Sequence, residues 1–245
     1  MRIGVLGAMP EEVALLEADI IAARSHAIGG RRYHEGELYG QSVVLAFSRM
    51  GKVASASTAT TMIAEYGVDL IVFSGVAGAA AADLTIGDVV VADAMAQHDM
   101  DARPLFSRFE VPLLGCSRFA AEPKFAGSLL KAAGDFLSEE GNSRFNLEKP
   151  KARLGLIGSG DQFMSDPAKL TALREALPGL ACVEMEGAAV AQVCHEHGIP
   201  LAVARVISDK ADHSAAVDFS HFVKTTARYY SQGILKRFFA ALKDG

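Results

Sequence analysis

Short apolar stretches alternate with longer amphipathic ones along almost the whole chain. The short stretches are rich in Val, Ile and Leu, and several are apolar on both faces, as expected for strands that helices cover on either side. We expect strands at residues 3–7, 43–48, 70–74, 89–96, 153–158, 181–183 and 201–207.

The longer stretches carry apolar residues three or four positions apart, which is the spacing of an amphipathic helix. Asp166 followed by Pro167 marks a helix start, and Gly198 with Pro200 marks a helix end. We expect helices at residues 10–23, 53–66, 123–139, 167–177 and 185–197, and a last helix along the apolar stripe from Phe219 to Ala241. The alternation predicts an α/β fold in a single domain over residues 1–245.

Two segments depart from this alternation. The sequence Tyr39–Gly40–Gln41, inside residues 35–48, is typical of a hairpin turn, so part of the sheet is expected to be antiparallel. Residues 99–121 contain two prolines and no clear period, which predicts a long loop. A loop of that length in a compact domain is usually functional or lies at an interface.

Composition narrows the class of protein. Half of the 245 residues are hydrophobic, and the mean hydropathy of +0.21 raises the question of a membrane. No uncharged apolar run reaches the length of about 18 residues that spans a bilayer, so we expect no membrane contact and assign the surplus to subunit burial. The net charge of −5 provides no basic field for nucleic acid. The three cysteines, Cys116, Cys182 and Cys194, form no CxxC pair, which favours unpaired thiols in a cytoplasmic protein.

Acidic residues gather where strands end, and open α/β sheets bind ligands beyond the carboxyl ends of their strands. They are Glu11 and Glu12 after the first strand, Glu184 and Glu186 after the sixth, and Asp209 after the seventh. The Gly-rich turns match neither the dinucleotide fingerprint nor the phosphate-binding loop. A carboxylate at a helix start would repel phosphate and could orient a water. The pattern predicts a hydrolytic small-molecule site without naming its substrate.

Each of these residues also has a structural interpretation. Glu12 would complement the dipole of the first helix, and Asp209 would serve as a helix cap or loop former. Arg205 lies inside an apolar strand, where a salt bridge and a site role are both consistent with its burial. Glu184 and Glu186 are two positions apart, so on a helix they point different ways and we expect one of them to face the cleft.

The order of motifs resembles the 5′-methylthioadenosine/S-adenosylhomocysteine nucleosidase family, a branch of the purine nucleoside phosphorylase superfamily. The motifs run from residue 1 to about residue 240 and are GAMPEEV, GKVAS, SGVAG, GDVVVAD, QHDMD, SGDQF, VEMEGAAVAQVC and ARVISDKAD. The resemblance implies a three-layer αβα fold around a twisted mixed sheet, a nucleoside phosphorylase-like fold. It also implies a homodimer and hydrolysis of the N-glycosidic bond to adenine and a 5′-thio-substituted ribose, with no cofactor and no metal.

The resemblance also implies a role for each matching position. Asp209 would be the general acid that protonates adenine at N7, Glu12 the carboxylate that activates water, and Arg205 a neighbour of that water. The implied substrate-binding positions are Met185 and Glu186 at the ribose, Phe163 and Met164 at adenine, Gly78 through its backbone, Ser208 beside the acid, and Met9, Met50 and Phe219 in the apolar lining.

Some positions depart from the family pattern. Val76 stands where many members have Ser, Arg49–Met50 replaces the usual Gly–Ile, and residues 102–106 match poorly. These changes leave the preferred 5′ substituent of the nucleoside undetermined. The alternatives are therefore a hydrolase of another nucleoside such as futalosine, a purine nucleoside phosphorylase, and a nucleoside-binding sensor without activity. The presence of Glu12, Glu186 and Asp209 together favours an enzyme.

Overall fold

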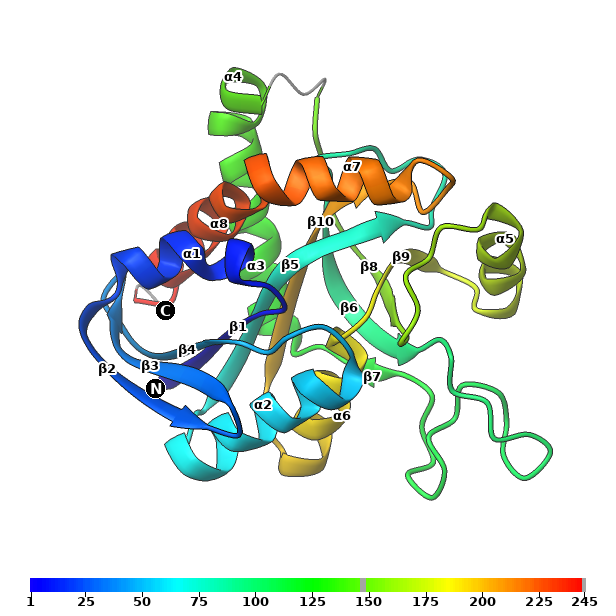
Figure 1. Ribbon diagram of the computed structural model, residues 1–245, viewed down its shortest axis with the longest axis horizontal. Coiled ribbons are helices and arrows are strands. Elements are labelled where there is room, and N and C mark those ends of the chain that lie inside the picture. Colours follow the sequence, from blue (N-terminus) through cyan, green and yellow to red (C-terminus); the bar gives the residue numbers. More distant parts are fainter. Residues whose placement is uncertain (146–148, 244–245) are drawn as a thin grey trace.

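The computed structural model describes residues 1–145 and 149–243 and shows a mixed sheet between two groups of helices (Figure 1). The strands are β1 (Arg2–Gly7), β2 (Ile21–Ile28), β3 (Arg31–Leu38), β4 (Gln41–Phe47), β5 (Leu70–Ala79), β6 (Val89–Gln97), β7 (Phe119–Ala120), β8 (Ala152–Ser159), β9 (Leu180–Glu184) and β10 (Leu201–Asp209). The helices are α1 (Pro10–Asp19), α2 (Lys52–Tyr66), α3 (Pro123–Phe136), α4 (Asn142–Phe145), α5 (Pro167–Ala176), α6 (Gly187–His197), α7 (Ala215–Phe222) and α8 (Arg228–Ala241), with π-helical turns η1 (Leu137–Gly141) and η2 (Val223–Ala227).

The sheet closes on itself around strand β5. The strand order is β10-β6-β8-β9-β5-β1-β4-β3-β2, and β10 also pairs with β5, so five strands form a ring from which β1, β4, β3 and β2 extend. Helices α2 and α6 pack together on one side of the sheet, and α1, α3 and α8 pack together on the other (Figure 1). Every residue of β5 is buried, as expected for a strand covered on both faces. The expected three-layer arrangement with a mixed sheet is therefore confirmed.

The directions of the strands bring several strand ends together. Strands β1, β4, β5 and β10 run parallel to one another, so their carboxyl ends lie at one edge. Strand β9 runs antiparallel to β5, with Gly78 opposite Val183, which returns the residues after β9 alongside residues 76–78. The acidic residues at these strand ends are thus brought into one region.

The predicted hairpin is confirmed. Leu38 pairs with Gln41 across a two-residue turn in which Tyr39 has φ 50° and Gly40 has φ 78°. Two consecutive positive φ values fit the twist of an antiparallel ribbon. Residues 99–118 form turns, as expected, and the end of that segment adds the short strand β7 to the edge of β6.

Other boundaries differ from the prediction. The first helix ends at Asp19, not at residue 23, because Ile20 is extended and Ile21 already pairs with Glu37. Strand β2 was missed because its polar residues show no alternation. The last apolar stripe, predicted as one helix, forms two helices joined by the π-helical turn η2. The helical spacing of apolar residues does not reveal a single π-helical turn, so this break was not predicted. No helix in residues 1–145 and 149–243 is both long and apolar enough to cross a membrane.

The hairpin turn provides a test of the fold. Gly40→Ala should lower the free energy of unfolding by about 1 kcal/mol, because an L side chain is disfavoured at φ 78°. Gly127, an exposed residue inside α3 with nothing near its missing Cβ, is the matched control, and Gly127→Ala should be stabilising by up to about 1 kcal/mol. Urea unfolding measures both variants, and shifts of the same sign would contradict this account of the turn.

Candidate active site

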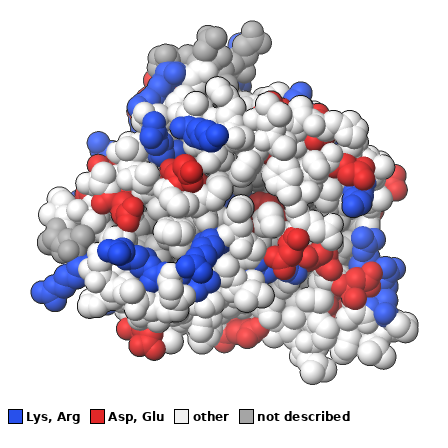
Figure 2. All heavy atoms as spheres, viewed as in Figure 1, with Lys and Arg blue, Asp and Glu red and all other residues white. Residues whose placement is uncertain are grey.

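One cavity lies where the strand ends meet, and it contains about 560 Å³ of space that opens to solvent. Figure 2 shows this face of the molecule hollowed near its centre. The lining residues come from seven segments: Ala8, Met9, Glu12, Met50, Val76, Ala77, Gly78, Gln162, Phe163, Met164, Val183, Glu184, Met185, Glu186, Ser208, Asp209 and Phe219. Every residue expected at the site except Arg205 is in this set.

Glu12 lies in the first turn of α1 and is held by three backbone N–H groups. Its Oε2 accepts hydrogen bonds from Ala8 N (2.6 Å) and Met9 N (3.0 Å), and its Oε1 accepts one from Val76 N (3.0 Å). A Cβ on Gly75 would lie 2.7 Å from Oε1, so only glycine allows this approach. Burial raises the pKa of Glu12, against the opposing effects of the Arg205 charge and the three N–H groups.

Asp209 ends strand β10 and lines the cavity beside Gly78. Its Oδ2 accepts a hydrogen bond from Ser208 Oγ (2.8 Å), and its Oδ1 accepts one from Ala211 N (2.9 Å). The strand is irregular here, so that Asp209 and not Ser208 pairs with Gly78. Burial raises the pKa of Asp209, although both hydrogen bonds favour the ionised form. A raised pKa keeps a carboxyl group able to donate a proton near neutral pH.

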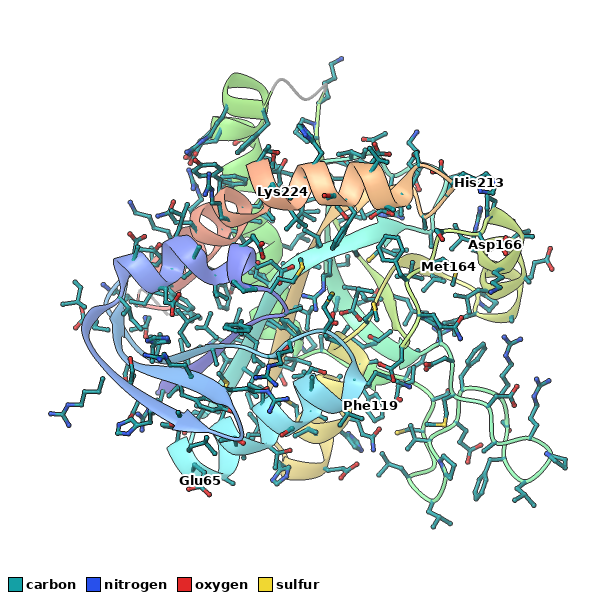
Figure 3. The ribbon with its side chains drawn as sticks, viewed as in Figure 1. Glu65, Phe119, Met164, Asp166, His213 and Lys224 are labelled. Carbon is teal, nitrogen blue, oxygen red and sulfur yellow. The ribbon has the colours of Figure 1, made fainter. Side chains whose placement is uncertain are left out.

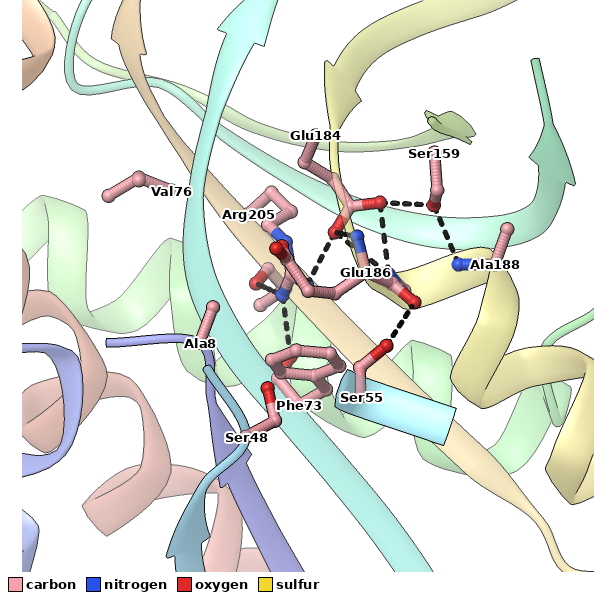
Figure 4. Close-up of polar contacts among 12 residues, drawn as sticks. Ala8, Ser48, Ser55, Phe73, Val76, Ser159, Glu184, Glu186, Ala188 and Arg205 are labelled. Atoms are coloured by element: carbon pink, nitrogen blue, oxygen red, sulfur yellow. Dashed lines mark hydrogen bonds and ion pairs between the residues drawn. The ribbon is translucent and has the colours of Figure 1, made fainter. Parts of the chain in front are cut away.

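Arg205 is fully buried next to the cavity and pairs with Glu184. Its Nη2 lies 2.8 Å from Glu184 Oε2, and its guanidinium carbon lies 4.1 Å from the centre of the Phe73 ring (Figure 4). Its Nη1 donates to the carbonyl oxygens of Phe73 (3.3 Å) and Ala204 (3.2 Å). The burial of Arg205 is therefore compensated by an ion pair, a ring face and two carbonyls.

Glu184 is the carboxylate partner of Arg205, a role that was not predicted, although a buried arginine in an apolar strand signals such a partner. Glu184 accepts hydrogen bonds from Glu186 N (3.1 Å), Gly187 N (2.8 Å) and the hydroxyl of Ser159. The expectation that only one of Glu184 and Glu186 faces the cleft was wrong, because both line the cavity. The two residues precede the first turn of α6, so the helical geometry assumed for them does not apply.

Glu186 is the N-cap residue of α6, and its side chain is turned toward the cavity. Its Oε1 accepts a hydrogen bond from Gly51 N (2.7 Å), and its carbonyl accepts one from Ser55 Oγ (3.2 Å). Burial, with a further contribution from the negative charge of Glu184, raises the pKa of Glu186 to about 8. The carboxylates of Glu12, Glu184 and Glu186 and the guanidinium of Arg205 thus form one buried cluster of interacting charges.

The open end of the cavity is apolar. Phe163 and Met50 are 44% and 60% exposed, and the Phe163 ring meets the Phe219 ring edge to face with centroids 5.5 Å apart. Met164 follows Phe163 on the loop between β8 and α5 (Figure 3). Val76 presents an apolar side chain to the cavity, while its backbone N–H holds Glu12. This end suits an apolar substituent more than a charged one.

Arg49, one of the departures from the family pattern, adopts a backbone conformation that favours glycine. Its φ is 71°, and its Nη2 donates to Gly30 O (2.7 Å) at the tip of the β2–β3 hairpin. The neighbouring Met50 is thereby placed at the cavity rim.

The described residues contain no group of three or more His, Cys, Asp or Glu side chains placed to hold a metal ion. Cys116, Cys182 and Cys194 are free thiols, as expected. Burial raises the pKa of the Cys194 thiol to about 12, so this sulfur is not a reactive thiolate.

The comparisons with known proteins agree with the fold. The model of the phosphorylase superfamily matches residues 2–240. The 5′-methylthioadenosine/S-adenosylhomocysteine nucleosidase of Aeromonas salmonicida is 34% identical over 96% of this chain and 98% of its own length. The enzyme of the same name from Shewanella putrefaciens is 37% identical over 94% and 95%, respectively.

Solved structures extend the comparison. The nucleosidase of Neisseria meningitidis, solved in complex with methylthio-immucillin-A, has a TM-score of 0.89 at 32% identity, and the match covers 98% of this chain and 99% of that one. The futalosine hydrolase of Helicobacter pylori has a TM-score of 0.85 at 33% identity and covers 98% of both chains. A nucleoside phosphorylase-like fold is therefore established for this chain. The chain belongs to the 5′-methylthioadenosine/S-adenosylhomocysteine nucleosidase family within the phosphorylase superfamily.

The raised pKa of Glu186 predicts how stability depends on pH. Because the folded state holds a proton that the unfolded state releases above its ordinary pKa of 4.5, the stability contributed by Glu186 is lost as pH rises toward about 8. Glu186→Gln removes this loss, so its Tm relative to wild type should rise by about 3 °C or more between pH 5 and pH 8.5. Differential scanning calorimetry without ligand measures the effect. Glu175→Gln, an exposed change on α5, is the control, and an equal pH slope in Glu186→Gln and wild type would refute the assignment.

Proposed function

We propose that the protein hydrolyses the N-glycosidic bond of 5′-methylthioadenosine, S-adenosylhomocysteine or both, releasing adenine and a 5′-thio-substituted ribose. One observation carries the choice of hydrolysis over phosphorolysis. The described lining of the cavity includes the carboxylate side chains of Glu12, Glu184, Glu186 and Asp209. It includes no side chain of Lys, Arg or His. A phosphate nucleophile would be repelled there, whereas water would find proton acceptors.

Adenine is a poor anionic leaving group, so cleavage of the C–N bond requires protonation of the base. In the proposed reaction Asp209, with its raised pKa, gives a proton to N7 of adenine. As the bond breaks, the ribosyl group becomes positively charged, and the nearby carboxylates stabilise it electrostatically. Glu12 takes a proton from the water that adds to the sugar carbon, and Glu186 orients the ribose hydroxyls.

The remaining site residues complete this proposal. Phe163 and Met164 contact the adenine, Gly78 approaches it through the backbone, and Ser208 orients the carboxyl group of the acid. Met185 packs on the sugar face, and Met9, Met50 and Phe219 contact the 5′-thio group. Arg205 acts through its charge, which favours the ionised form of Glu12. No cofactor takes part in the proposed reaction.

A second candidate is hydrolysis of futalosine, because the Helicobacter pylori futalosine hydrolase matches nearly the whole chain. The two reactions use the same bond cleavage and differ in the nucleoside. Adenine or base release should therefore be measured on methylthioadenosine, adenosylhomocysteine, futalosine and inosine, each with and without phosphate. Fastest release from the 5′-thio nucleosides without phosphate supports the proposal, fastest release from futalosine supports the second candidate, and dependence on phosphate overturns both.

Matched substitutions should distinguish the proposed general acid Asp209 and the proposed general base Glu12 from neighbouring carboxylates. Asp209→Asn and Glu12→Gln should each lower kcat by about 10²-fold to 10⁴-fold, because each removes a proton-transfer group. The controls are Asp93→Asn on β6 and Glu11→Gln beside Glu12, whose side chains are exposed and which should keep wild-type kcat. Steady-state adenine release measures all four variants. Wild-type kcat in Asp209→Asn would remove Asp209 from the mechanism.

We also propose that the protein is a cytoplasmic homodimer. The three free thiols support a reducing compartment. Leu105 and Leu113, in the long loop between β6 and β7, are 83% and 93% exposed, and covering such side chains favours association. Light scattering at micromolar concentration should give twice the chain mass of 25.9 kDa. A single-chain mass at that concentration would contradict the dimer.

A further inference from the structure

We propose that Glu184 is a positioning residue for the reaction: its carboxylate joins Arg205 to the first turn of α6 and thereby sets where the Arg205 charge lies relative to Glu12 and Glu186. The inference rests on the proposed function for its kinetic test. It concerns a residue that touches neither the base nor the water in the mechanism above.

The hydrogen-bonding capacity of Glu184 is used within the protein. Oε2 accepts from Arg205 Nη2 (2.8 Å), Gly187 N (2.8 Å) and Glu186 N (3.1 Å). Oε1 accepts from the Ser159 hydroxyl and from Gly187 N (3.0 Å). Although Glu184 borders the cavity, a carboxylate with this many donors has little capacity left for a substrate hydroxyl.

Because Glu184 binds the first turn of α6, the Glu186 side chain does not have to cap that helix and can line the cavity. A helix start leaves backbone N–H groups without partners, and an N-cap side chain usually accepts from them. Here the N-cap residue is Glu186, and its side chain makes no capping hydrogen bond. Glu184 and Ser159 take over this task, since Ser159 Oγ accepts from Ala188 N (2.6 Å) while Glu184 accepts from Gly187 N. The Glu186 carboxylate therefore turns to Gly51 and the cavity.

The contact with Arg205 fixes a buried positive charge. Both oxygens of Glu12 are bound by backbone N–H groups, and Arg205 makes its closest ion pair with Glu184. Without that carboxylate, the nearest anions for Arg205 are Glu12 and Glu186, both of which already feel its charge. Arg205 would then shift toward them and hold them more firmly ionised.

Other charges that face this group come from several elements. Glu12 projects from α1, Glu186 from the start of α6, Arg205 from β10, and His98 from the turn after β6, where it feels the Glu184 charge. The Cys182 thiol on β9 also feels that charge, and burial raises its pKa. Asp209 is held instead by Ser208 and Ala211 at the end of β10, so it serves as an internal reference.

Glu184→Gln tests the inference directly. It keeps the shape of the side chain but removes the charge, so the acid limb of the kcat/KM profile should move down by about one pH unit, as Glu12 and Glu186 ionise more easily. The kcat at the pH optimum should fall by about 10-fold to 100-fold through misplacement of Glu186. Glu196→Gln, an exposed change on α6, is the matched control and should leave both quantities unchanged.

Glu184→Asp and Ser159→Ala keep the test decisive if Glu184→Gln does not fold. Glu184→Asp retains the charge but shortens the reach, so the acid limb should stay in place while kcat falls. Ser159→Ala removes the hydroxyl that donates to Glu184 Oε1. In this variant kcat should fall, and Tm should change less than in the Glu184 variants. A lower Tm with wild-type kcat in both variants would reduce Glu184 to a structural role and overturn the inference.

A readout without substrate separates this inference from the proposed function. Titration of ¹³C-labelled glutamate carboxyl groups by NMR in the ligand-free protein should show a lower pKa for Glu186 in Glu184→Gln than in wild type. An unmoved Glu186 titration overturns the inference even where adenine release by the wild type supports the function. A moved titration in a protein that releases no adenine supports the charge coupling and removes the proposed function.

Discussion

The buried ion pair between Arg205 and Glu184 is the interaction on which the site depends. Arg205 sits in the middle of β10, and leaving a buried charge unpaired costs about 3–5 kcal/mol. Glu184 meets this requirement from the end of β9, which fixes the return of that strand alongside β5. The same carboxylate also binds the start of α6. One electrostatic requirement thus places a strand end, a helix start and the neighbouring Glu186.

Around this pair the protein concentrates acidic groups in one cavity at the strand ends. Backbone N–H groups hold Glu12 at a helix start where other proteins bind phosphate, and Asp209 lines the same cavity at the end of β10. Burial raises the pKa of both carboxyl groups, which suits Asp209 as the proposed proton donor and brings the pKa of Glu12 closer to neutral pH, where a general base is most effective. The proposed hydrolysis follows from this charge arrangement, and the apolar rim formed by Met50 and Phe163 suits the thioether substituent of the proposed substrates.

Much of this arrangement could be predicted from local patterns. The Tyr39–Gly40 turn was predicted because consecutive positive φ values restrict the residues that fit. The site residues could be located because the carboxyl ends of strands meet, and the family motifs gave each a role. The role of Glu184 was missed because it depends on β9 and β10 lying close together, which no local pattern encodes. Strand β2 was missed for a different reason: its residues show no alternation, and the strand is held by pairing with β3.

In the proposed reaction water, and not phosphate, is the nucleophile in a cavity lined by carboxylates. The most direct test is cleavage of methylthioadenosine in ¹⁸O-labelled water containing phosphate, with mass analysis of the sugar product. The account predicts methylthioribose that carries one ¹⁸O atom and adenine release at a rate independent of phosphate. A ribose 1-phosphate product, or unlabelled sugar at early times, would contradict it.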